Sequence, residues 1–274
     1  MSVALVEAVA RLREAVETYN RDKILSPLEA KLQKQMAVIF KKQKRAFLPE
    51  FAKLKSQFSE AVDPGQLKKI VDRVTARTSS EMQTTIQATG KDAYGSGIEA
   101  GSTLGHAISF TVDHPQAVQW LQNHAAEAVS QIDDTTRNVI GNLVTQGTEE
   151  GWSYSKTARM ISDRFDEFAE GRPQEHIRSR AELVAVNETG TAYEQGHYDS
   201  IGSLVQQGLT MEKSWADMED DRVCEDCQKN ADAGWIPYDE DFPTGDQCAP
   251  HDPGCRCNTQ YQVASGNETT QEEQ

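Results

Sequence analysis

The sequence predicts a mainly α-helical protein that ends in a small α+β region, which we interpret as a metal-binding knuckle. Two observations lead to this fold class. Before Lys213, apolar residues recur every three to four positions, which is the spacing of amphipathic helices. All five cysteines then fall between Cys224 and Cys257, in a segment rich in turn-forming residues. We expect elongated N-terminal helices followed by a compact C-terminal domain.

The composition favours long helices in a soluble protein. At 274 residues the chain can form one large domain or two ordinary ones, and its hydrophobic content of 37% and aromatic content of 7% are modest. The first stretch, MSVALVEAVARLREAV, carries a charge every few residues, unlike a signal peptide. No uncharged apolar run approaches the roughly 18 residues of a membrane helix. We expect the protein to be made, and to stay, in a cytosol.

The net charge of −15 is distributed unevenly. Between Arg21 and Arg77 there are 14 basic residues against 6 acidic ones, whereas the remainder carries 14 basic and 37 acidic residues. This split indicates a basic arm on an acidic body, and such an arm can bind nucleic acid or an acidic protein surface. The alternative is an ordinary solvated helix face. The candidate contact residues of the arm are Lys41, Lys42, Lys44, Arg45, Lys53 and Lys55.

Residues 1–90, which include this arm, are expected to form three helices. In ILSPLEAKL, Ser26 can cap a helix and Pro27 fits a first helical turn. We therefore expect a first helix to end before Ser26 and a second, of about 36 residues, to start there. Asp63 precedes the third helix. A long apolar stripe usually packs against a partner helix or another subunit, so we also consider self-association through these helices.

Glycine, alanine and serine dominate residues 91–112. Their glycines follow neither GxGxxG nor a GK[ST] ending, so the stretch is not a phosphate-binding loop. We interpret it as a flexible connection or as a close-packed helix of small residues, and place the domain boundary here. Residues 113–258 form the second domain, in which Ser153 is expected to cap a helix. Residues 259–274 form a polar tail that we expect to be disordered.

Short strands and tight turns are expected within residues 213–258, which hold the cysteines. Five cysteines crowded into one window of a cytosolic protein indicate a metal site rather than a disulfide framework. A Cys-x-x-Cys pair is the usual first half of a structural zinc site. The residues that can supply the second half are Cys248, His251, Cys255 and Cys257. We predict one structural zinc ion bound by Cys224, Cys227, Cys255 and Cys257, with His251 as the substitute for one of the last pair.

Other interpretations of this window stay open. The thiols can be buried without a metal, or can oxidise to disulfides outside a cell. His251 resembles one part of a histidine-metal-finger nuclease, but no histidine follows Cys257 and little chain remains. The acidic residues Glu182, Glu188 and Glu194 have no nucleophile or histidine beside them in the sequence. We therefore predict no catalytic residues and no enzymatic activity.

Three stretches resemble the C-terminal domain of phage minor head proteins, the head-morphogenesis family typified by the Mu F protein. They are RAELVAVNETGTAYEQG, KSWADMEDDRVCEDC and HDPGCRC, and the resemblance covers about residues 113–258. Asn187 stands where the family usually has threonine, and Asp252 lengthens the spacing from histidine to cysteine by one residue. The positions that match the motifs are Arg180, Ala181, Ala185, Glu188, Ala192, Gly196, Trp215, Asp220, Arg222, Cys224, Cys227, Pro250, His251, Pro253, Cys255, Arg256 and Cys257.

The resemblance implies a virion component that lies inside the phage head, is associated with the portal, and assists head assembly and DNA packaging or ejection. The implied partners are the portal protein, the major capsid or scaffold protein, and viral DNA bound by the basic arm, with no membrane involved during assembly in the host cytoplasm. The alternative function is a nucleic-acid-binding zinc module. Salt-dependent DNA binding that requires residues 21–77 would favour that alternative.

Overall fold

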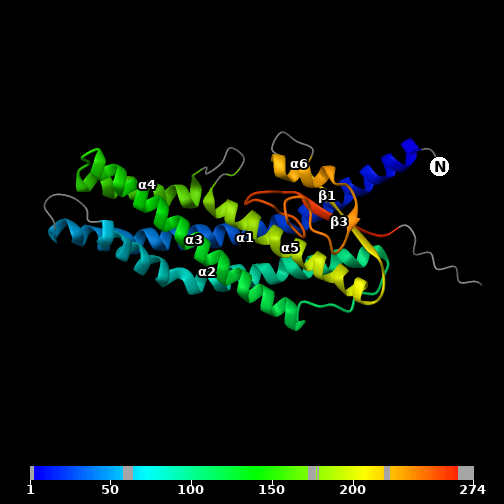
Figure 1. The fold of residues 1–274 in the computed structure, drawn as a ribbon. Helices are drawn as coiled ribbons and strands as arrows, with labels where there is room; N and C mark the ends of the chain where they lie inside the picture. The colour runs from blue at the N-terminus through cyan, green and yellow to red at the C-terminus, as the bar shows by residue number, and fades with distance from the viewer. Residues whose placement is uncertain (1–2, 58–63, 172–176, 178, 219–222, 265–274) are drawn as a thin grey trace, which may run out of the picture. The chain divides into compact units, whose positions relative to one another are not determined.

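The computed structural model describes residues 3–57, 64–171, 177, 179–218 and 223–264. Within these ranges the side chains of residues 3–15, 17–19, 54–57 and 64 are not described. The protein is mainly helical and carries a small antiparallel sheet near its C-terminus, which confirms the predicted fold class (Figure 1). The helices are α1 (Val3–Gln57), α2 (Pro64–Gly101), α3 (Pro115–Glu149), α4 (Tyr154–Glu170), α5 (Arg180–Gln206) and α6 (Glu225–Asp232), with a 3-10 turn at Ser102–Leu104. The strands are β1 (Met211–Ala216), β2 (Ile236–Pro237) and β3 (Asn258–Val263).

The predicted break at Ser26 is wrong, because α1 runs through this position without interruption. The Ser26 hydroxyl donates to the carbonyl of Asp22, one turn earlier, and therefore does not cap a new helix. Leu25 and Leu32, on either side of Pro27, are both fully buried. Burial on both sides of the proline holds the helix together and outweighs the single backbone hydrogen bond that proline cannot make.

The stretch of small residues at 91–112 begins as a packed helix. Helix α2 continues to Gly101. A Cβ atom on Gly97 would lie 2.0 Å from the carbonyl oxygen of Tyr193, and one on Gly196 would lie 2.1 Å from that of Tyr94. Glycine is therefore required where α2 and α5 cross, and residues up to Gly101 follow the close-packed alternative for this stretch.

The chain forms two compact units that interleave along the sequence. One consists of Met1–Leu28, Gly90–Gln119 and Val186–Gln274, and the other of Glu29–Thr89 and Trp120–Ala185. The units therefore do not follow the ranges 1–90, 91–112 and 113–258 that we proposed as domains. The physical reason is that α1, α2, α3 and α5 are long enough to contribute residues to both units.

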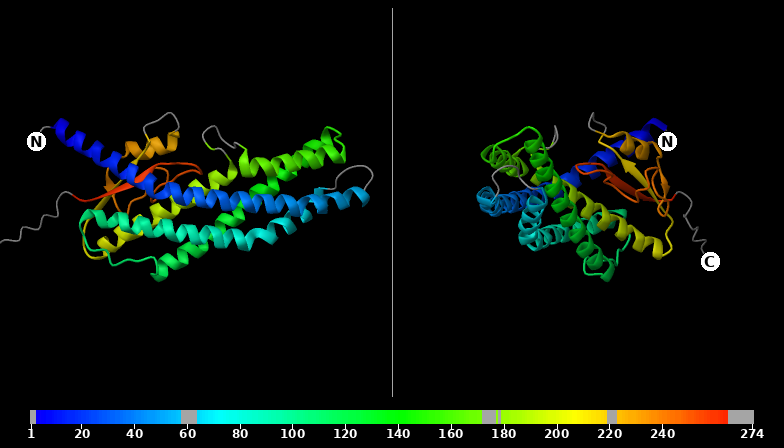
Figure 2. Two further views of the ribbon diagram at one scale, coloured as in Figure 1. Left: turned by 180° about the vertical axis from the view of Figure 1, so that it is seen from behind. Right: turned by 60° about the vertical axis from the view of Figure 1, so that its left-hand side comes forward.

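The second of these units is a bundle of helical segments that lie lengthwise along one another (Figure 2). Phe40 and Phe168 are 5.6 Å apart between ring centroids, and Phe47 and Phe165 are 5.8 Å apart, so aromatic side chains join α1 to α4. The predicted cap of α4 is confirmed, since the Ser153 side chain accepts a hydrogen bond from the backbone N–H three residues later.

The first unit contains the three-stranded sheet, in the order β2-β1-β3 with both pairings antiparallel. Met211 and Tyr261, from β1 and β3, pack against Ile201 and Leu204 of α5. Strand β3 extends to Val263, so the ordered chain continues past the expected start of the tail at 259. The residues of β3 adopt a regular strand because they pair with β1 and because the side chain of Tyr261 is buried. The rest of the predicted tail, from 265, lies outside the described residues.

Candidate metal centre

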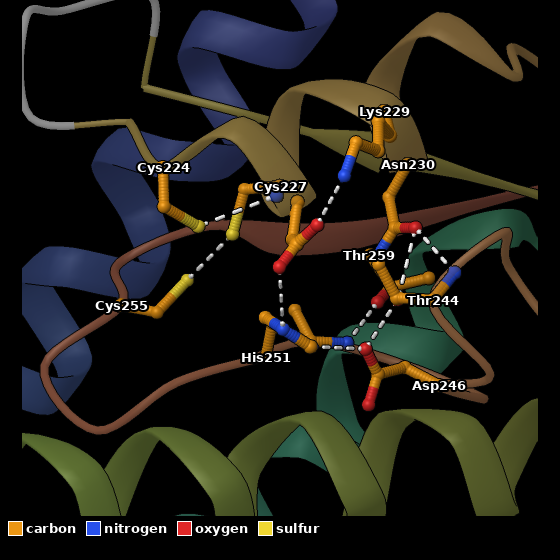
Figure 3. Close-up of polar contacts among 11 residues, drawn as sticks. Cys224, Cys227, Lys229, Asn230, Thr244, Asp246, His251, Cys255 and Thr259 are labelled. Carbon is orange, nitrogen blue, oxygen red and sulfur yellow. Dashed lines mark hydrogen bonds and ion pairs between the residues drawn. The ribbon is translucent and has the colours of Figure 1, made fainter.

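Helix α6 positions the first pair of cysteines. Cys224 is the N-cap residue of α6, and its sulfur accepts a hydrogen bond of 3.3 Å from the backbone N–H of Cys227 (Figure 3). Cys227 lies in the first turn of the helix and is buried. The Cys-x-x-Cys spacing thus places one sulfur at the helix cap and turns the next toward the interior.

A tight turn before β3 positions the second pair. The backbone N–H of Cys255 donates to the carbonyl of Asp252 over 3.0 Å, and Gly254 within this turn has a φ of 89°. This left-handed conformation favours glycine. The turn brings Cys255 and Cys257 back toward α6, with Cys257 immediately before β3.

Three sulfurs meet in one cluster. The Sγ atoms of Cys227, Cys255 and Cys257 all lie within 4.8 Å of one another, and those of Cys227 and Cys255 are 3.5 Å apart. In a tetrahedral zinc site with Zn–S bonds of about 2.3 Å, sulfurs are about 3.8 Å apart. The spacing therefore fits three ligands of one metal ion, and the cysteine set suits a soft, tetrahedral metal.

The protonation of the cluster also suits a cation. Hydrogen bonds from the Cys227 and Cys257 thiols lower the pKa of Cys255, because they stabilise its thiolate. The contact with Cys255 raises the pKa of Cys227. A metal ion bound by these three sulfurs would take the place of the thiol protons.

The cluster is enclosed by apolar side chains. Cys227 and Cys257 pack with Trp215, Phe242 and Ala249, which are all buried. The indole nitrogen of Trp215 is buried with no hydrogen-bond partner among the described residues. A buried donor beside a sulfur cluster fits a site in which the sulfurs are thiolates, since a thiolate is a much stronger acceptor than a thiol.

The structure places the remaining sequence-predicted candidates around this cluster. The Cys224 sulfur is in contact with Cys227, and this contact also raises the pKa of the Cys227 thiol, although less than Cys255 does. The Cys248 sulfur is not part of the cluster, and burial raises its pKa well above the ordinary value.

His251 lies between two carboxylates rather than in the cluster. Its Nδ1 is 2.6 Å from Asp246 Oδ2, and its Nε2 is 3.6 Å from Asp226 Oδ2 (Figure 3). The hydrogen bond with Asp246 raises the pKa of His251 most strongly. Both ring nitrogens therefore face oxygen atoms, so the histidine that we considered as a substitute for Cys255 or Cys257 contacts carboxylates instead of the sulfurs.

A polar network that the sequence did not predict joins α6 to the loop that carries His251. The buried Asn230 of α6 donates to Thr244 Oγ1 over 2.7 Å and accepts from the Thr244 N–H over 3.2 Å. The Thr244 hydroxyl also donates to Asp246, the carboxylate that contacts His251, over 2.6 Å. No spacing or motif in the sequence marks these residues, because they meet only through the fold.

Three candidate contact lysines of the basic arm are paired with acidic residues that are distant in the sequence. The ammonium groups of Lys41, Lys42 and Lys44 each lie 2.5 Å from a carboxylate. Their partners are Glu170, Glu81 and Asp166, respectively. Arg45 and Lys53 are exposed, and the Lys55 side chain lies outside the described residues.

No helix in the described part of the chain is both long enough and apolar enough to cross a bilayer.

Comparison with known proteins agrees with the motifs. The model of a family described as Phage Mu protein F like protein matches residues 138–260, a range that includes α5, the sheet and the cysteine cluster. No curated protein and no solved structure matches the chain. The match confirms the resemblance that the motifs indicate, and residues 138–260, a little under half of the chain, are similar to the Phage Mu protein F like family.

Proposed function

We propose that the protein is a structural, non-enzymatic component of a phage head whose C-terminal region is closed by one zinc ion. The observation that carries the proposal is the coincidence of two findings. A cluster of three sulfurs, two of them from the buried residues Cys227 and Cys257, lies within residues 138–260, which match a phage family model. The cluster supplies cysteine ligands, and the family match supplies the phage setting.

The ligands that we assign are Cys227, Cys255 and Cys257, with Cys224 as the fourth. A site that is fully occupied by protein side chains leaves no open position for substrate or water, so its role is structural. When bound, the zinc ion cross-links α6 to the turn before β3. Structural zinc sites contribute about 10 kcal/mol or more of apparent binding free energy, which is large for a region with a small core.

The setting that we assign is the inside of the head, in contact with the portal, with a role in assembly and in DNA packaging or ejection. The support is the family match together with the long amphipathic helices, which offer extended surfaces for packing against other subunits. During assembly the protein would be in the host cytoplasm.

Quantitative mass spectrometry of purified phage particles tests this setting. We expect the chain in DNA-filled heads, at few copies relative to the major capsid protein, with chemical cross-links to the portal. A chain that is absent from purified heads, or that cross-links only to tail proteins, would contradict the proposal.

A nucleic-acid-binding zinc module is the second candidate, because residues 21–77 carry 14 basic against 6 acidic residues. Fluorescence anisotropy with a DNA duplex at several salt concentrations tests it, with Arg45→Gln as the variant and Lys41→Gln as the matched control. If DNA is bound through free cations of α1, loss of exposed Arg45 should weaken binding more than loss of Lys41, which already lies 2.5 Å from Glu170. Equal DNA binding by the two variants, binding that does not depend on salt, or no detectable binding would exclude this second function.

A further inference from the structure

Trp215 stands at the centre of the small sheet, against the cysteine cluster. It belongs to β1 and faces Thr259 of β3 in the antiparallel pairing. Its side chain is 3% exposed, and its ring meets that of Phe242 edge-on, with 5.1 Å between the centroids. The same apolar cluster includes Cys227 and Cys257. A phenylalanine could fill the same kind of apolar space, so packing alone does not explain why the ring carries an N–H group.

The indole N–H of Trp215 has no acceptor at hydrogen-bond distance among the described residues, although it is buried. A buried donor without an acceptor is costly, and each such group in a folded protein calls for a physical explanation. Other tryptophans show the contrast: the Trp152 indole donates to Glu150 over 2.7 Å, and Trp235 is 42% exposed.

Cys257 is the sulfur that the geometry offers as an acceptor for this N–H. Trp215 pairs with Thr259, two residues after Cys257, so both side chains lie on the same side of the strand pair. Both also belong to the same apolar cluster. A neutral thiol is a weak acceptor, whereas a thiolate bound to a metal keeps its charge and accepts strongly.

We propose that Trp215 is a positioning residue that donates its indole N–H to the metal-bound Cys257 thiolate. The inference rests on the proposed metal site, and it gives the buried N–H group an acceptor. In this arrangement the N–H fixes the orientation of the Cys257 sulfur and disperses part of its charge. Loss of such an outer hydrogen bond typically weakens metal binding by about 10- to 100-fold.

Proton NMR of the full chain with ¹⁵N-labelled tryptophan tests the contact without any substitution. The four tryptophan indole signals are compared in the metal-free protein and after addition of one equivalent of Zn²⁺. We expect the Trp215 indole proton to shift downfield and to exchange more slowly with solvent when zinc is bound. The Trp152 and Trp235 signals are internal controls, because one donor already has a carboxylate acceptor and the other side chain is exposed.

A substitution gives a second, independent measurement. Trp215→Phe keeps an aromatic ring but removes the donor, and Trp235→Phe is the matched control at an exposed position. With competition by a chromophoric chelator, we expect Trp215→Phe to bind Zn²⁺ about 10- to 100-fold more weakly and the control to bind as the wild type does. With Co²⁺ in place of zinc, the sulfur-to-metal charge-transfer band should change in Trp215→Phe only.

The outcomes separate this inference from the proposed metal site. If the wild-type chain binds no zinc, the metal site itself is wrong and the role of Trp215 falls with it. If the chain binds one zinc ion but the Trp215 signal does not move, the metal site stands and the inference is overturned. Should Trp215→Phe fail to fold, the wild-type indole signal decides the question alone.

Discussion

The buried ion pair between Arg21 and Glu194 allows a quantitative test of the fold around the sheet. Arg21 Nε donates to Glu194 Oε1 over 2.9 Å, and the side chains are 4% and 0% exposed. The other carboxylate oxygen accepts the Thr259 N–H over 3.0 Å. One carboxylate of α5 thus holds both α1 and β3. The change that we consider is Arg21→Met, which keeps the apolar stem and removes the charge.

We expect this change to lower the free energy of unfolding by about 3–5 kcal/mol at pH 8, because it leaves an uncompensated buried carboxylate. Burial raises the pKa of Glu194 from 4.5 to about 7, more than Arg21 and the Thr259 N–H lower it. A carboxyl group with a raised pKa binds its proton more tightly when folded, so stability falls as pH rises between the two values. One pKa unit corresponds to about 1.4 kcal/mol, so ionisation of Glu194 lowers the free energy of unfolding by about 3 kcal/mol between pH 4.5 and 7.

Loss of Arg21 removes a group that lowers the pKa of Glu194. The free energy of unfolding of the variant should therefore continue to fall above pH 7. Urea denaturation followed by circular dichroism from pH 5 to pH 9 measures this. The matched control is Lys41→Met, which removes an ion pair whose side chains are 45% and 72% exposed and should cost less than about 1 kcal/mol. If Arg21→Met costs no more than the control, and equally at pH 5 and pH 8, the reasoning is refuted.

Two further substitutions test close contacts. Gly97→Ala places a methyl group against the carbonyl of Tyr193, so we expect thermal unfolding to show a free energy of unfolding lower by about 1–3 kcal/mol. The control Gly95→Ala, with nothing within 4 Å, should be neutral or stabilising, and equal effects of the two changes would exclude a close helix crossing. Arg180→Lys should cost about 1–3 kcal/mol in chemical denaturation, since lysine cannot keep both the bond to Thr136 Oγ1 and the bond to a backbone carbonyl, and a neutral result would contradict the role of the guanidinium group.

The sequence predicted the helical class, the small sheet and the location of the cysteines because these depend on local patterns. Apolar spacing, turn residues and the Cys-x-x-Cys unit can all be recognised within a few residues of one another. The capping role of Ser153 was also predictable, since an N-cap is a local hydrogen bond.

Two features of the fold depend on residues that are distant in the sequence. The sequence around Pro27 is typical of a helix start, but burial of Leu25 and Leu32 keeps α1 continuous. The lysines of the arm look like a free basic surface, yet Lys44 lies 2.5 Å from Asp166, which is 122 residues away. Neither the burial of these leucines nor the Lys44–Asp166 ion pair leaves a signal in the neighbouring sequence.

The candidate site shows the same division. The cysteine pairs were recognised from their spacing as a candidate site. The place of His251, which we considered as a substitute for Cys255 or Cys257, depended on how the loop folds back. His251 meets Asp246 and Asp226 instead of the sulfurs. The position of Trp215 against Cys257 could not be predicted either, because β1 and the turn before β3 come together only in the sheet.

Zinc content is the most direct test of the central claim that the cysteines hold the C-terminal region together. Metal is measured by mass spectrometry on full-length protein purified under reducing conditions, for the wild type, Cys227→Ser and the matched control Cys248→Ser. We predict one zinc ion per chain in the wild type and the control, and loss of zinc together with sheet order in Cys227→Ser. No zinc in the wild type, or equal zinc and an intact sheet in all three proteins, would contradict the account.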